Sequence, residues 1–293
     1  MPKRILLQLD VDSQPSTFDS VVAIDAGAEH LLRHGNVDSD NVIGLIHGAM
    51  FTRGGDDLAH TAVFIGGSHV GAAEAVYQAV KNAFFGPVRV SVMLDAAGCN
   101  TTAAAAVVSA ERHLDLSSGR ATVLGATGPV GRRVAQMLAR RGAEVVLCSR
   151  QQSRAEAARD DVRVAIPGSN VHAAAPTDRV AMSDLLETID VLFACGAAGV
   201  QLVDRDILEN SSRLKVAIDL NAVPPAGLEG VEPFNKAQPI REDGNLLTYG
   251  PIGVGGLKMK THRKAIAMLF ESNDATLDAD EIDAIATRLE ATR

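Results

Sequence analysis

The sequence is poor in aromatic side chains, cysteine and positive charge. Its 293 residues include no Trp, two Tyr and three Cys, and the formal net charge is −8. A negatively charged chain without aromatic stacking platforms is poorly suited to bind a polyanionic nucleic acid. Cys99, Cys148 and Cys195 lie far apart and form no C-x-x-C pair, so they indicate neither a disulfide framework nor a zinc site. We therefore expect neither a nucleic-acid partner nor a bound metal.

Long hydrophobic runs are also missing. No apolar run approaches the roughly 18 residues of a membrane span, and the five residues between Arg4 and Asp10 are too few for the apolar part of a signal peptide. These patterns favour a cytoplasmic protein without a membrane partner. A hydrophobic content of 46% in 293 residues is enough for the cores of two domains of ordinary size.

The clearest local pattern lies in residues 120–150, where an apolar strand, a glycine turn, a helix and a second apolar strand follow one another. Gly125, Gly128 and Gly131 stand between the first strand and an apolar-periodic helix. Glycines at this place let the phosphates of a dinucleotide approach the backbone N–H groups at the helix N-terminus. The spacing is G-x-x-G-x-x-G instead of G-x-G-x-x-G, but the context between strand and helix is typical of nucleotide binding.

The second strand of this unit ends in Ser149 and Arg150. An NAD-selective site carries Asp or Glu near this position for the ribose 2′-hydroxyl, and this sequence has no acid there. Arg150, together with Ser149 and Arg154, is suited instead to hold the 2′-phosphate of NADP by charge-assisted hydrogen bonds. The alternative is that Arg150 is a solvated residue at the start of a helix.

Strand and helix patterns alternate along the rest of the chain, which predicts parallel sheets and an α/β fold. A first domain is expected to end near Asp95, and residues 115–119 mark the boundary to the nucleotide domain. The expected strands cover residues 4–11, 61–65, 88–94, 191–194, 214–220 and 246–249, with a short one near Val171. The expected helices begin at residues 15–19 and cover residues 71–84, 100–114, 153–164, 178–187, 257–272 and 278–291. Residues 224–245 are expected to be irregular because they are rich in Pro and Gly.

Ligands of open α/β sheets bind beyond the carboxyl ends of the strands. This rule selects Asp10, Asp19, Asp95, Asn100, Thr101, Thr102, Asp219, Asn221 and residues 253–258. Residues 250–256 predict a second glycine turn, which places Lys258 on the first turn of a helix, where a cation opposes the helix dipole and needs a reason. The alternatives are that Lys258, Lys260 and His262 form a solvated helix face, that His262 is structural, and that Asp19 is a helix cap.

Longer motifs occur along nearly the whole chain. They are Pro15-Ser16-Thr17-Phe18-Asp19, Thr52-Arg53-Gly54-Gly55, Phe84-Phe85-Gly86-Pro87, Met93-Leu94-Asp95, Asn100 to Ala105, Thr127 to Gly131, Asn221-Ala222 with Pro224-Pro225, and Gly255-Gly256-Leu257-Lys258. Taken together, they resemble the NAD(P)-dependent methylene-tetrahydromethanopterin and methylene-tetrahydrofolate dehydrogenases of bacterial one-carbon metabolism.

The resemblance implies two domains with an active cleft at their junction. Residues 116–256 would form a Rossmann-type parallel-sheet cofactor domain, and residues 1–115 with 257–293 a smaller α/β pterin-binding domain. It also implies a homo-oligomer, NADP as the cofactor with NAD as a further acceptor, and tetrahydromethanopterin as the co-substrate. The implied catalytic residues are Lys258, Asp19 and Thr102. Together with the glycine pattern and the strand-end rule, the expected cofactor-binding residues are Gly125, Thr127, Gly128, Pro129, Val130, Gly131, Ser149, Arg150, Arg154, Asn221 and Gly253.

The implied reaction is hydride transfer from 5,10-methylene-tetrahydromethanopterin to NADP, which gives the 5,10-methenyl form during formaldehyde oxidation. This chemistry needs no obligatory base, since the two nitrogens beside the methylene carbon delocalise the positive charge. Lys258 is then expected to position the pterin. Three alternatives stay open: methylene-tetrahydrofolate as the main substrate, a shikimate-type NADP-dependent dehydrogenase with a Lys and Asp proton relay, and a non-catalytic NADP-binding sensor.

Overall fold

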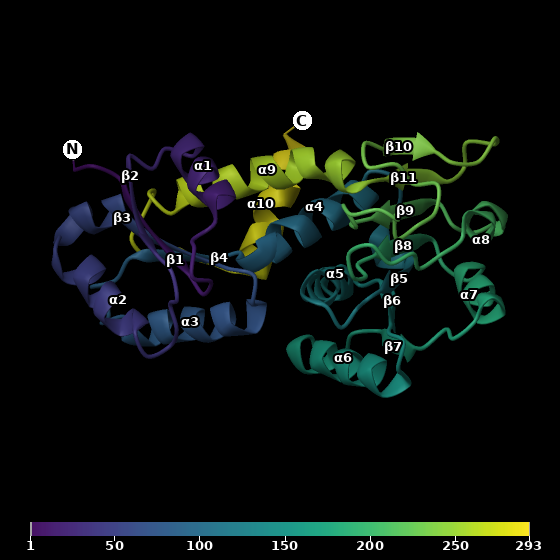
Figure 1. Ribbon diagram of the computed structural model, residues 1–293, viewed down its shortest axis with the longest axis horizontal. Helices are drawn as coiled ribbons and strands as arrows, with labels where there is room; N and C mark the ends of the chain where they lie inside the picture. The colour runs from purple at the N-terminus through teal and green to yellow at the C-terminus, as the bar shows by residue number, and fades with distance from the viewer. Residues whose placement is uncertain (1, 293) are drawn as a thin grey trace. The chain divides into compact units, whose positions relative to one another are not determined.

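The computed structural model describes residues 2–292 of the chain. The chain divides into two compact units: Met1–Thr101 with Lys258–Arg293 form unit 1, and Thr102–Leu257 form unit 2. Each unit is built around its own sheet (Figure 1). The predicted α/β class with two parallel-sheet domains is therefore confirmed.

Unit 1 contains a five-stranded sheet in which all strand pairs are parallel. Its order is β12-β4-β3-β1-β2, with β1 (Ile5–Asp10), β2 (His30–His34), β3 (Thr61–Gly66), β4 (Ser91–Leu94) and β12 (Thr276–Leu277). From β1 the chain first adds β2 on one side and then β3 on the other. The strand order thus reverses between β1 and β3, which is where open α/β sheets bind ligands.

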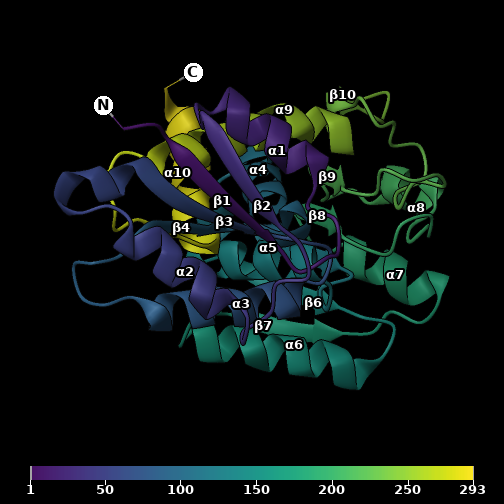
Figure 2. The same ribbon diagram turned by 60° about the vertical axis from the view of Figure 1, so that its left-hand side comes forward.

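Helices cover both faces of this sheet (Figure 2). One face carries α2 (Val42–Phe51) and α3 (Val70–Ala83), and the other carries α1 (Thr17–Asp25) and the part of α9 (Pro251–Met268) that begins at Lys258. The last helix, α10 (Ala279–Ala291), starts with a capping box between Asp278 and Glu281. Helix α1 is capped by Ser16, whose hydroxyl accepts the backbone N–H of Asp19 at 3.2 Å.

Unit 2 contains a seven-stranded sheet that is parallel except at one edge. Its order is β10-β11-β9-β8-β5-β6-β7, with β5 (Arg120–Leu124), β6 (Glu144–Cys148), β7 (Val171–Ala174), β8 (Val191–Ala194), β9 (Val216–Asp219), β10 (Lys236–Pro239) and β11 (Leu247–Tyr249). Strands β8 and β9 are buried throughout, as expected for strands covered on both faces. The strand order reverses between β5 and β8, the position at which Rossmann folds bind a dinucleotide.

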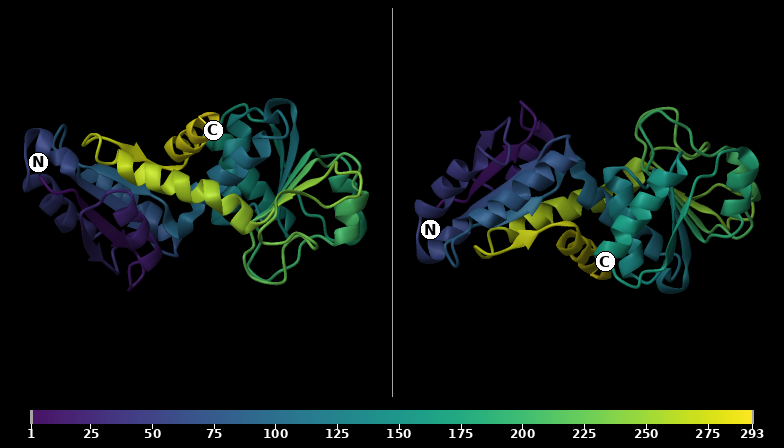
Figure 3. Two further views of the ribbon diagram at one scale, coloured as in Figure 1. Left: turned by 90° about the horizontal axis from the view of Figure 1, so that it is seen from above. Right: turned by 90° about the horizontal axis from the view of Figure 1, so that it is seen from below.

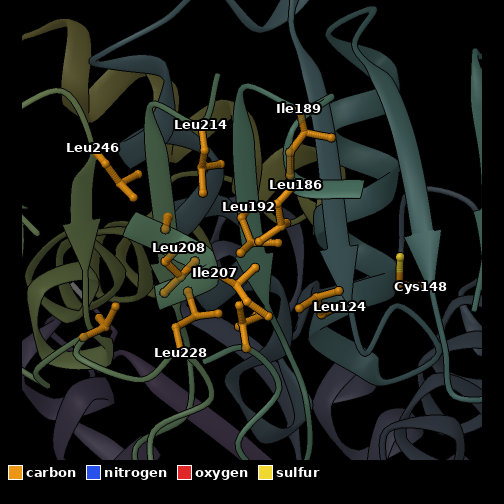
Figure 4. Close-up of a cluster of buried hydrophobic side chains, with 14 of the residues drawn as sticks. Leu124, Cys148, Leu186, Ile189, Leu192, Ile207, Leu208, Leu214, Leu228 and Leu246 are labelled. Atoms are coloured by element: carbon orange, nitrogen blue, oxygen red, sulfur yellow. The ribbon is translucent and has the colours of Figure 1, made fainter. Parts of the chain in front are cut away.

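The core of unit 2 lies where helices pack on this sheet. One side carries α5 (Pro129–Arg140) and α6 (Gln152–Ala165), and the other carries α7 (Arg179–Leu186) and α8 (Arg205–Asn210). Figure 4 shows the second interface, where Leu186, Ile207 and Leu208 of the helices pack against Leu124 and Leu192 of the strands. Burial of such side chains stabilises each by about 1.5–3 kcal/mol. The remaining helices are α4 (Cys99–Glu111) and the short 3-10 helices η1 (Gly55–His60), η2 (Ala96–Gly98) and η3 (Leu116–Ser118).

The predicted glycine turn at residues 250–256 is wrong, because α9 already begins at Pro251 and runs without interruption to Met268 (Figure 3). The glycines of this segment have no positive φ; two of them serve close packing. A Cβ on Gly250 would lie 2.1 Å from the carbonyl oxygen of Glu232, and one on Gly253 would lie 1.8 Å from that of Asn235. Lys258 is therefore the eighth residue of α9, and the prediction that it opposes the dipole on the first turn is also wrong.

Other differences from the predicted elements have similarly local causes. Residues 224–245 are not wholly irregular, since β10 pairs with β11 there. Helix α4 starts at Cys99 instead of residue 100, and Asp95 caps it: its carboxylate accepts the N–H groups of Asn100 and Thr101 at 2.9 and 3.1 Å. The sequence pattern missed β2, β12, α2 and α8, which are a half-exposed edge strand, a two-residue strand and two short helices.

Within residues 2–292, no helix combines the length and the apolar character needed to cross a bilayer.

Candidate functional site

The glycine turn of unit 2 is shaped by two glycines that the fold itself requires. Gly125 directly follows β5 and has a φ of +71°, and a Cβ there would lie 2.5 Å from the carbonyl oxygen of Cys195. A Cβ on Gly131 would lie 2.5 Å from the carbonyl oxygen of Gly125. The first glycine permits the left-handed turn, and the other permits α5 to pack closely against it.

Gly128 has a different character. It is the N-cap of α5, its φ is −79°, and the protein atom nearest to a Cβ there would be 3.4 Å away. Neither its conformation nor its packing requires glycine, so the lack of a side chain leaves space in front of the helix. Thr127 and Pro129 beside it are exposed, and Val130 is half-buried. The first N–H groups of a helix have no partner within it and carry partial positive charge, so this end of α5 fits the pyrophosphate of a dinucleotide.

Ser149 and Arg150 follow β6, as predicted, at the same edge of the sheet as the glycine turn, because β5 and β6 are parallel. Arg150 and Arg154 are both exposed, and within residues 2–292 neither guanidinium group has a hydrogen bond or ion pair. A free Arg at the end of the second strand is suited to bind a 2′-phosphate in a bidentate manner. Arg154 lies in the first turn of α6.

Asn221 and Gly253 each have a structural role: the first makes hydrogen bonds within a loop, and the second permits a close backbone contact. Asn221 follows β9, and its side-chain amide donates to the carbonyl oxygen of Pro225 at 3.0 Å and accepts the N–H of Val223 at 3.0 Å. The side chain therefore organises the loop after β9, which ends at the same edge of the sheet as β8. The absence of a side chain at Gly253 is explained by its contact with Asn235.

The switch point of unit 1 is lined by acidic side chains. Asp10 ends β1, and its carboxylate accepts the N–H groups of Asp12 and Ser16 at 2.9 and 3.0 Å, which holds the loop that leads into α1. Asp19, on the first turn of α1, approaches Gly66 at the end of β3: its Oδ2 lies 3.6 Å from the position that a Cβ on Gly66 would take. Ser16 is the cap of α1, so Asp19 is free of the capping role that the sequence left open.

Asp19 is only 14% exposed at its side chain. Burial raises its pKa from an ordinary value near 3.8 to about 6, and the negative charges of Asp95 and Asp10 act in the same direction. A hydrogen bond from Ser16 and the positive charge of Lys258 act against the rise in pKa. A carboxyl group that changes its charge near neutral pH at a sheet switch point is a functional-site candidate.

Lys258 and Phe18 form the partly exposed side of this cluster. The Nζ of Lys258 lies 4.3 Å above the centre of the Phe18 ring, within the range of a cation–π interaction. Phe18 is 49% exposed, so this side of the cluster is open to solvent. The predicted pair Asp19 and Lys258 is thus brought together in unit 1, and Phe18 joins it. Sequence reasoning assigned Phe18 no role, because an aromatic residue on the second position of a helix has no distinguishing pattern.

His262 lies one turn after Lys258 on α9 and is fully buried. Its ring stacks on Phe64 of β3 with centroids 5.5 Å apart, and its Nε2 lies 4.0 Å from Oδ1 of Asp19. Burial lowers the pKa of His262 to about 4, with Asp95 opposing and Lys258 reinforcing this effect. The prediction that Lys258, Lys260 and His262 share a solvated face is therefore wrong for His262; Lys260 is exposed.

Thr102 and its neighbours begin α4. Asp95 also accepts the hydroxyl of Thr101 at 2.6 Å, and the side-chain amide of Asn100 donates to the carbonyl oxygen of Leu94 at 2.7 Å. Asn100 and Thr101 are buried and stabilise the start of α4, whereas Thr102 is half-exposed. In the described part of the chain, no three His, Cys, Asp or Glu side chains gather as metal ligands do.

Family models match both units. A model described as "Methylene-tetrahydromethanopterin dehydrogenase, N-terminal" matches residues 17–97, which include Asp19 and Asp95. A model described as "NAD dependent epimerase/dehydratase family" matches residues 121–222, which include the glycine turn and Arg150.

Known proteins are similar to the chain over nearly its whole length. It is 42% identical over 291 residues to the "Bifunctional protein MdtA" of Methylorubrum extorquens, covering 99% of this chain and 100% of that protein. It is 31% identical over 281 residues, 94% of each chain, to the "NAD(P)-dependent methylenetetrahydromethanopterin dehydrogenase" of the same organism. Among solved structures, quinate dehydrogenase from Corynebacterium glutamicum in complex with NAD has a TM-score of 0.54 at 12% identity, covering 97% of this chain and 98% of that one. That likeness concerns the fold alone.

Proposed function

Because the chain belongs to the family of the NAD(P)-dependent methylenetetrahydromethanopterin dehydrogenases, we propose that it oxidises 5,10-methylene-tetrahydromethanopterin. A hydride leaves the methylene carbon and reduces NAD(P)⁺, and the pterin becomes the 5,10-methenyl form in one-carbon metabolism. The observation that carries this proposal is the similarity to a named dehydrogenase over 94% of the chain. The glycine turn of unit 2 and the Asp19 cluster of unit 1 support it with residues suited to the two ligands.

The nucleotide belongs in unit 2. Gly125, Gly128 and Gly131 shape a turn that fits a pyrophosphate at the N-terminus of α5, with Thr127, Pro129 and Val130 beside it. Arg150, with Ser149 and Arg154, would hold the 2′-phosphate, and this favours NADP over NAD. When bound, the nicotinamide ring of the cofactor supplies the hydride acceptor.

The pterin belongs in unit 1. Loss of a hydride leaves a cation shared by the two nitrogens beside the former methylene carbon, so the protein has no obligatory proton to remove. Its main task is to orient the ligand, which contributes to the rate by holding the reacting carbons in line at roughly 3–3.5 Å. Asp19 and Lys258 are the side chains of unit 1 that we assign to this task, and a role for the half-exposed Thr102, the first residue of unit 2, stays a prediction from the sequence. Lys258 acts as a hydrogen-bond donor directed at a part of the pterin away from the reacting carbon, since a cation close to the developing positive charge would be repulsive.

Turnover assays test the proposal directly. Methylene-tetrahydromethanopterin and methylene-tetrahydrofolate are each combined with NADP and with NAD, and the absorbance of the methenyl product and of the reduced nicotinamide is followed. We expect the highest rate with methylene-tetrahydromethanopterin and NADP. Activity only with methylene-tetrahydrofolate would show that the folate is the substrate. No turnover in any of the four assays, with intact NADP binding, would favour a non-catalytic sensor.

A Lys258→Ala variant tests the assigned role of the lysine. We expect kcat/KM for the pterin to fall about tenfold to a hundredfold, the effect of losing one charge-assisted hydrogen bond, while the KM for NADP stays unchanged. Lys260→Ala is the matched control, since Lys260 is exposed on the same helix. An unchanged kcat/KM in Lys258→Ala would show that Lys258 does not position the pterin.

Two further expectations from the sequence remain predictions. A homo-oligomer is checked by size-exclusion chromatography with light scattering on the purified chain. A cytoplasmic location is checked by fractionation of the cells that express it.

A further inference from the structure

The buried imidazole of His262 is unusual because neither of its nitrogens has a partner. Its side chain has 0% exposure, and within residues 2–292 no hydrogen bond reaches Nδ1 or Nε2. Buried polar atoms are nearly always hydrogen-bonded, and one without a partner destabilises the folded state. Phenylalanine would fill the same space without that cost. The histidine therefore calls for a functional explanation.

Two aromatic side chains lie against the ring. Phe64 stacks on it with an interplanar angle of 26°, and the Phe18 ring lies 6.3 Å away at 40°. These contacts fix the plane of the imidazole and therefore the direction in which Nε2 points. A donor with a fixed direction is what a positioning role requires.

One carboxylate lies near this nitrogen, that of Asp19. The distance of 4.0 Å between Nε2 and Oδ1 is about 1 Å too long for a hydrogen bond. His262 itself cannot touch a ligand, because it is fully buried, whereas the side chain of Asp19 is 14% exposed. An approach of about 1 Å would bring the two atoms to hydrogen-bond distance.

We propose that His262 is a positioning residue for the pterin: it donates Nε2–H to one oxygen of Asp19 when the pterin binds. The second oxygen is then oriented to accept N–H groups of the pterin ring. This inference rests on the proposed function, since it names a residue that acts on the same ligand through Asp19. Donation requires a neutral imidazole with its proton on Nε2 and a carboxylate that is ionised.

The charges around the pair agree with these states. Burial keeps the pKa of His262 near 4, so its ring is neutral at pH 7. Asp19 faces Asp10 at the end of β1, Asp95 after β4 and Lys258 on α9. With a pKa of about 6 in the free protein, Asp19 loses its charge on mild acidification. Two hydrogen-bond donors on the carboxylate favour its charged form and lower its pKa in the complex.

The test compares His262→Phe, His262→Gln and His262→Asn in the full-length protein. We expect His262→Phe to fold, to raise the KM for the pterin about tenfold or more, and to leave the KM for NADP unchanged. Below pH 7 its kcat should fall at a higher pH than in the wild type, because kcat reports the complex, in which Asp19 has lost a donor. His262→Gln, whose amide reaches the place of Nε2, should restore much of the pterin KM. His262→Asn, whose amide ends near the place of Nδ1, should not.

The outcomes separate the two proposals. Turnover by the wild type with an unchanged pterin KM and pH profile in His262→Phe would overturn the positioning role alone. If His262→Phe does not fold, equal pterin KM values for the Gln and Asn variants would overturn it instead. No turnover by the wild type in any of the four assays would contradict the proposed function. In that case, equal binding of tetrahydromethanopterin by the wild type and the Gln and Asn variants, measured by calorimetry, would overturn the positioning role as well.

Discussion

The two units share a doubly wound plan but prepare their candidate sites by different means. Unit 2 places backbone at its switch point: glycines let the chain turn sharply, and a helix N-terminus supplies N–H groups. Unit 1 places buried side chains at its switch point, namely Asp19 and His262, with Lys258 at the partly exposed side. A site made of backbone groups requires no buried polar side chains in addition to the fold itself. A site of buried polar side chains lowers the stability of its unit, because Asp19 is desolvated and His262 lacks hydrogen bonds.

The largest expected effects distinguish two glycines that look alike in the sequence of unit 2. Gly131→Ala should destabilise the protein by about 1–3 kcal/mol or more, because its Cβ would meet backbone atoms at 2.5 and 2.9 Å. Gly128→Ala should leave the fold nearly intact, since its Cβ has 3.4 Å of space, but weaken NADP binding about a hundredfold by blocking the phosphates. Thermal unfolding and calorimetric NADP binding check this pair. Intact NADP binding by Gly128→Ala would show that the cofactor phosphates do not bind at the glycine turn.

In unit 1, stability should depend on pH with opposite sign at the two buried groups. The pKa of Asp19 is raised to about 6, so its stabilising contribution is complete below its ordinary pKa near 3.8 and is lost as the pH rises through 6. Asp19→Asn should therefore stabilise the protein above pH 6, by on the order of 2–3 kcal/mol, and this gain should vanish toward pH 4. The pKa of His262 is lowered to about 4, so its contribution is lost as the pH falls from 6.5 toward 4.

The matched measurement is urea unfolding of Asp19→Asn and His262→Phe between pH 4 and 8. The gain in unfolding free energy should grow with pH for the first variant. For the second, it should grow as the pH falls, and a smaller part should persist at pH 8 because two unpartnered nitrogens are removed. Gains that do not change with pH would mean that neither group is desolvated, and the contrast between the units would disappear.

The contrast also explains which parts of the site could be predicted from sequence. The glycine turn between β5 and α5 was predicted from the sequence, since Gly125, Gly128 and Gly131 fall within seven positions between a strand and a helix. Asp19 and Lys258 lie on different helices far apart in the chain; the rule for strand ends selected both among other candidates, and the resemblance to a family assigned both to catalysis. The buried state of His262 depends on Phe64 and Phe18, and its own helix gives no local sign of it.

The elements were predicted best where both faces of a strand are buried. Residues 191–194 form β8 as expected, because a short continuous apolar run is typical of a central parallel strand. The edge strand β2, His-Leu-Leu-Arg-His, is half-exposed and has no such pattern. The start of α9 was misjudged, since glycine near Pro usually indicates a turn and the close approach of Asn235 that requires Gly253 comes from a distant part of the sequence.

Arg150 offers a test of cofactor selection in unit 2 with an effect of intermediate size. Arg150→Ala should raise the KM for NADP about tenfold to a hundredfold, the value of one charge-assisted interaction, and leave the KM for NAD unchanged. Arg154→Ala, also exposed on α6, is the control and should have a smaller effect. Equal changes with both cofactors would show that Arg150 does not contact the 2′-phosphate.

The smallest expected effect concerns glycines of unit 2 that neither the fold nor the turn requires. Gly255 and Gly256 lie inside α9, and apart from the backbone of their own helix no atom of residues 2–292 lies within 4 Å of a Cβ on either. Alanine is favoured over glycine in a helix interior by roughly 0.5–1 kcal/mol. Gly255→Ala and Gly256→Ala should therefore each stabilise the protein by about that amount in urea unfolding, whereas Gly253→Ala should destabilise it, because its Cβ would lie 1.8 Å from Asn235. Destabilisation by all three alanines would instead indicate a glycine turn, and α9 would then begin near Leu257, as the sequence pattern predicted.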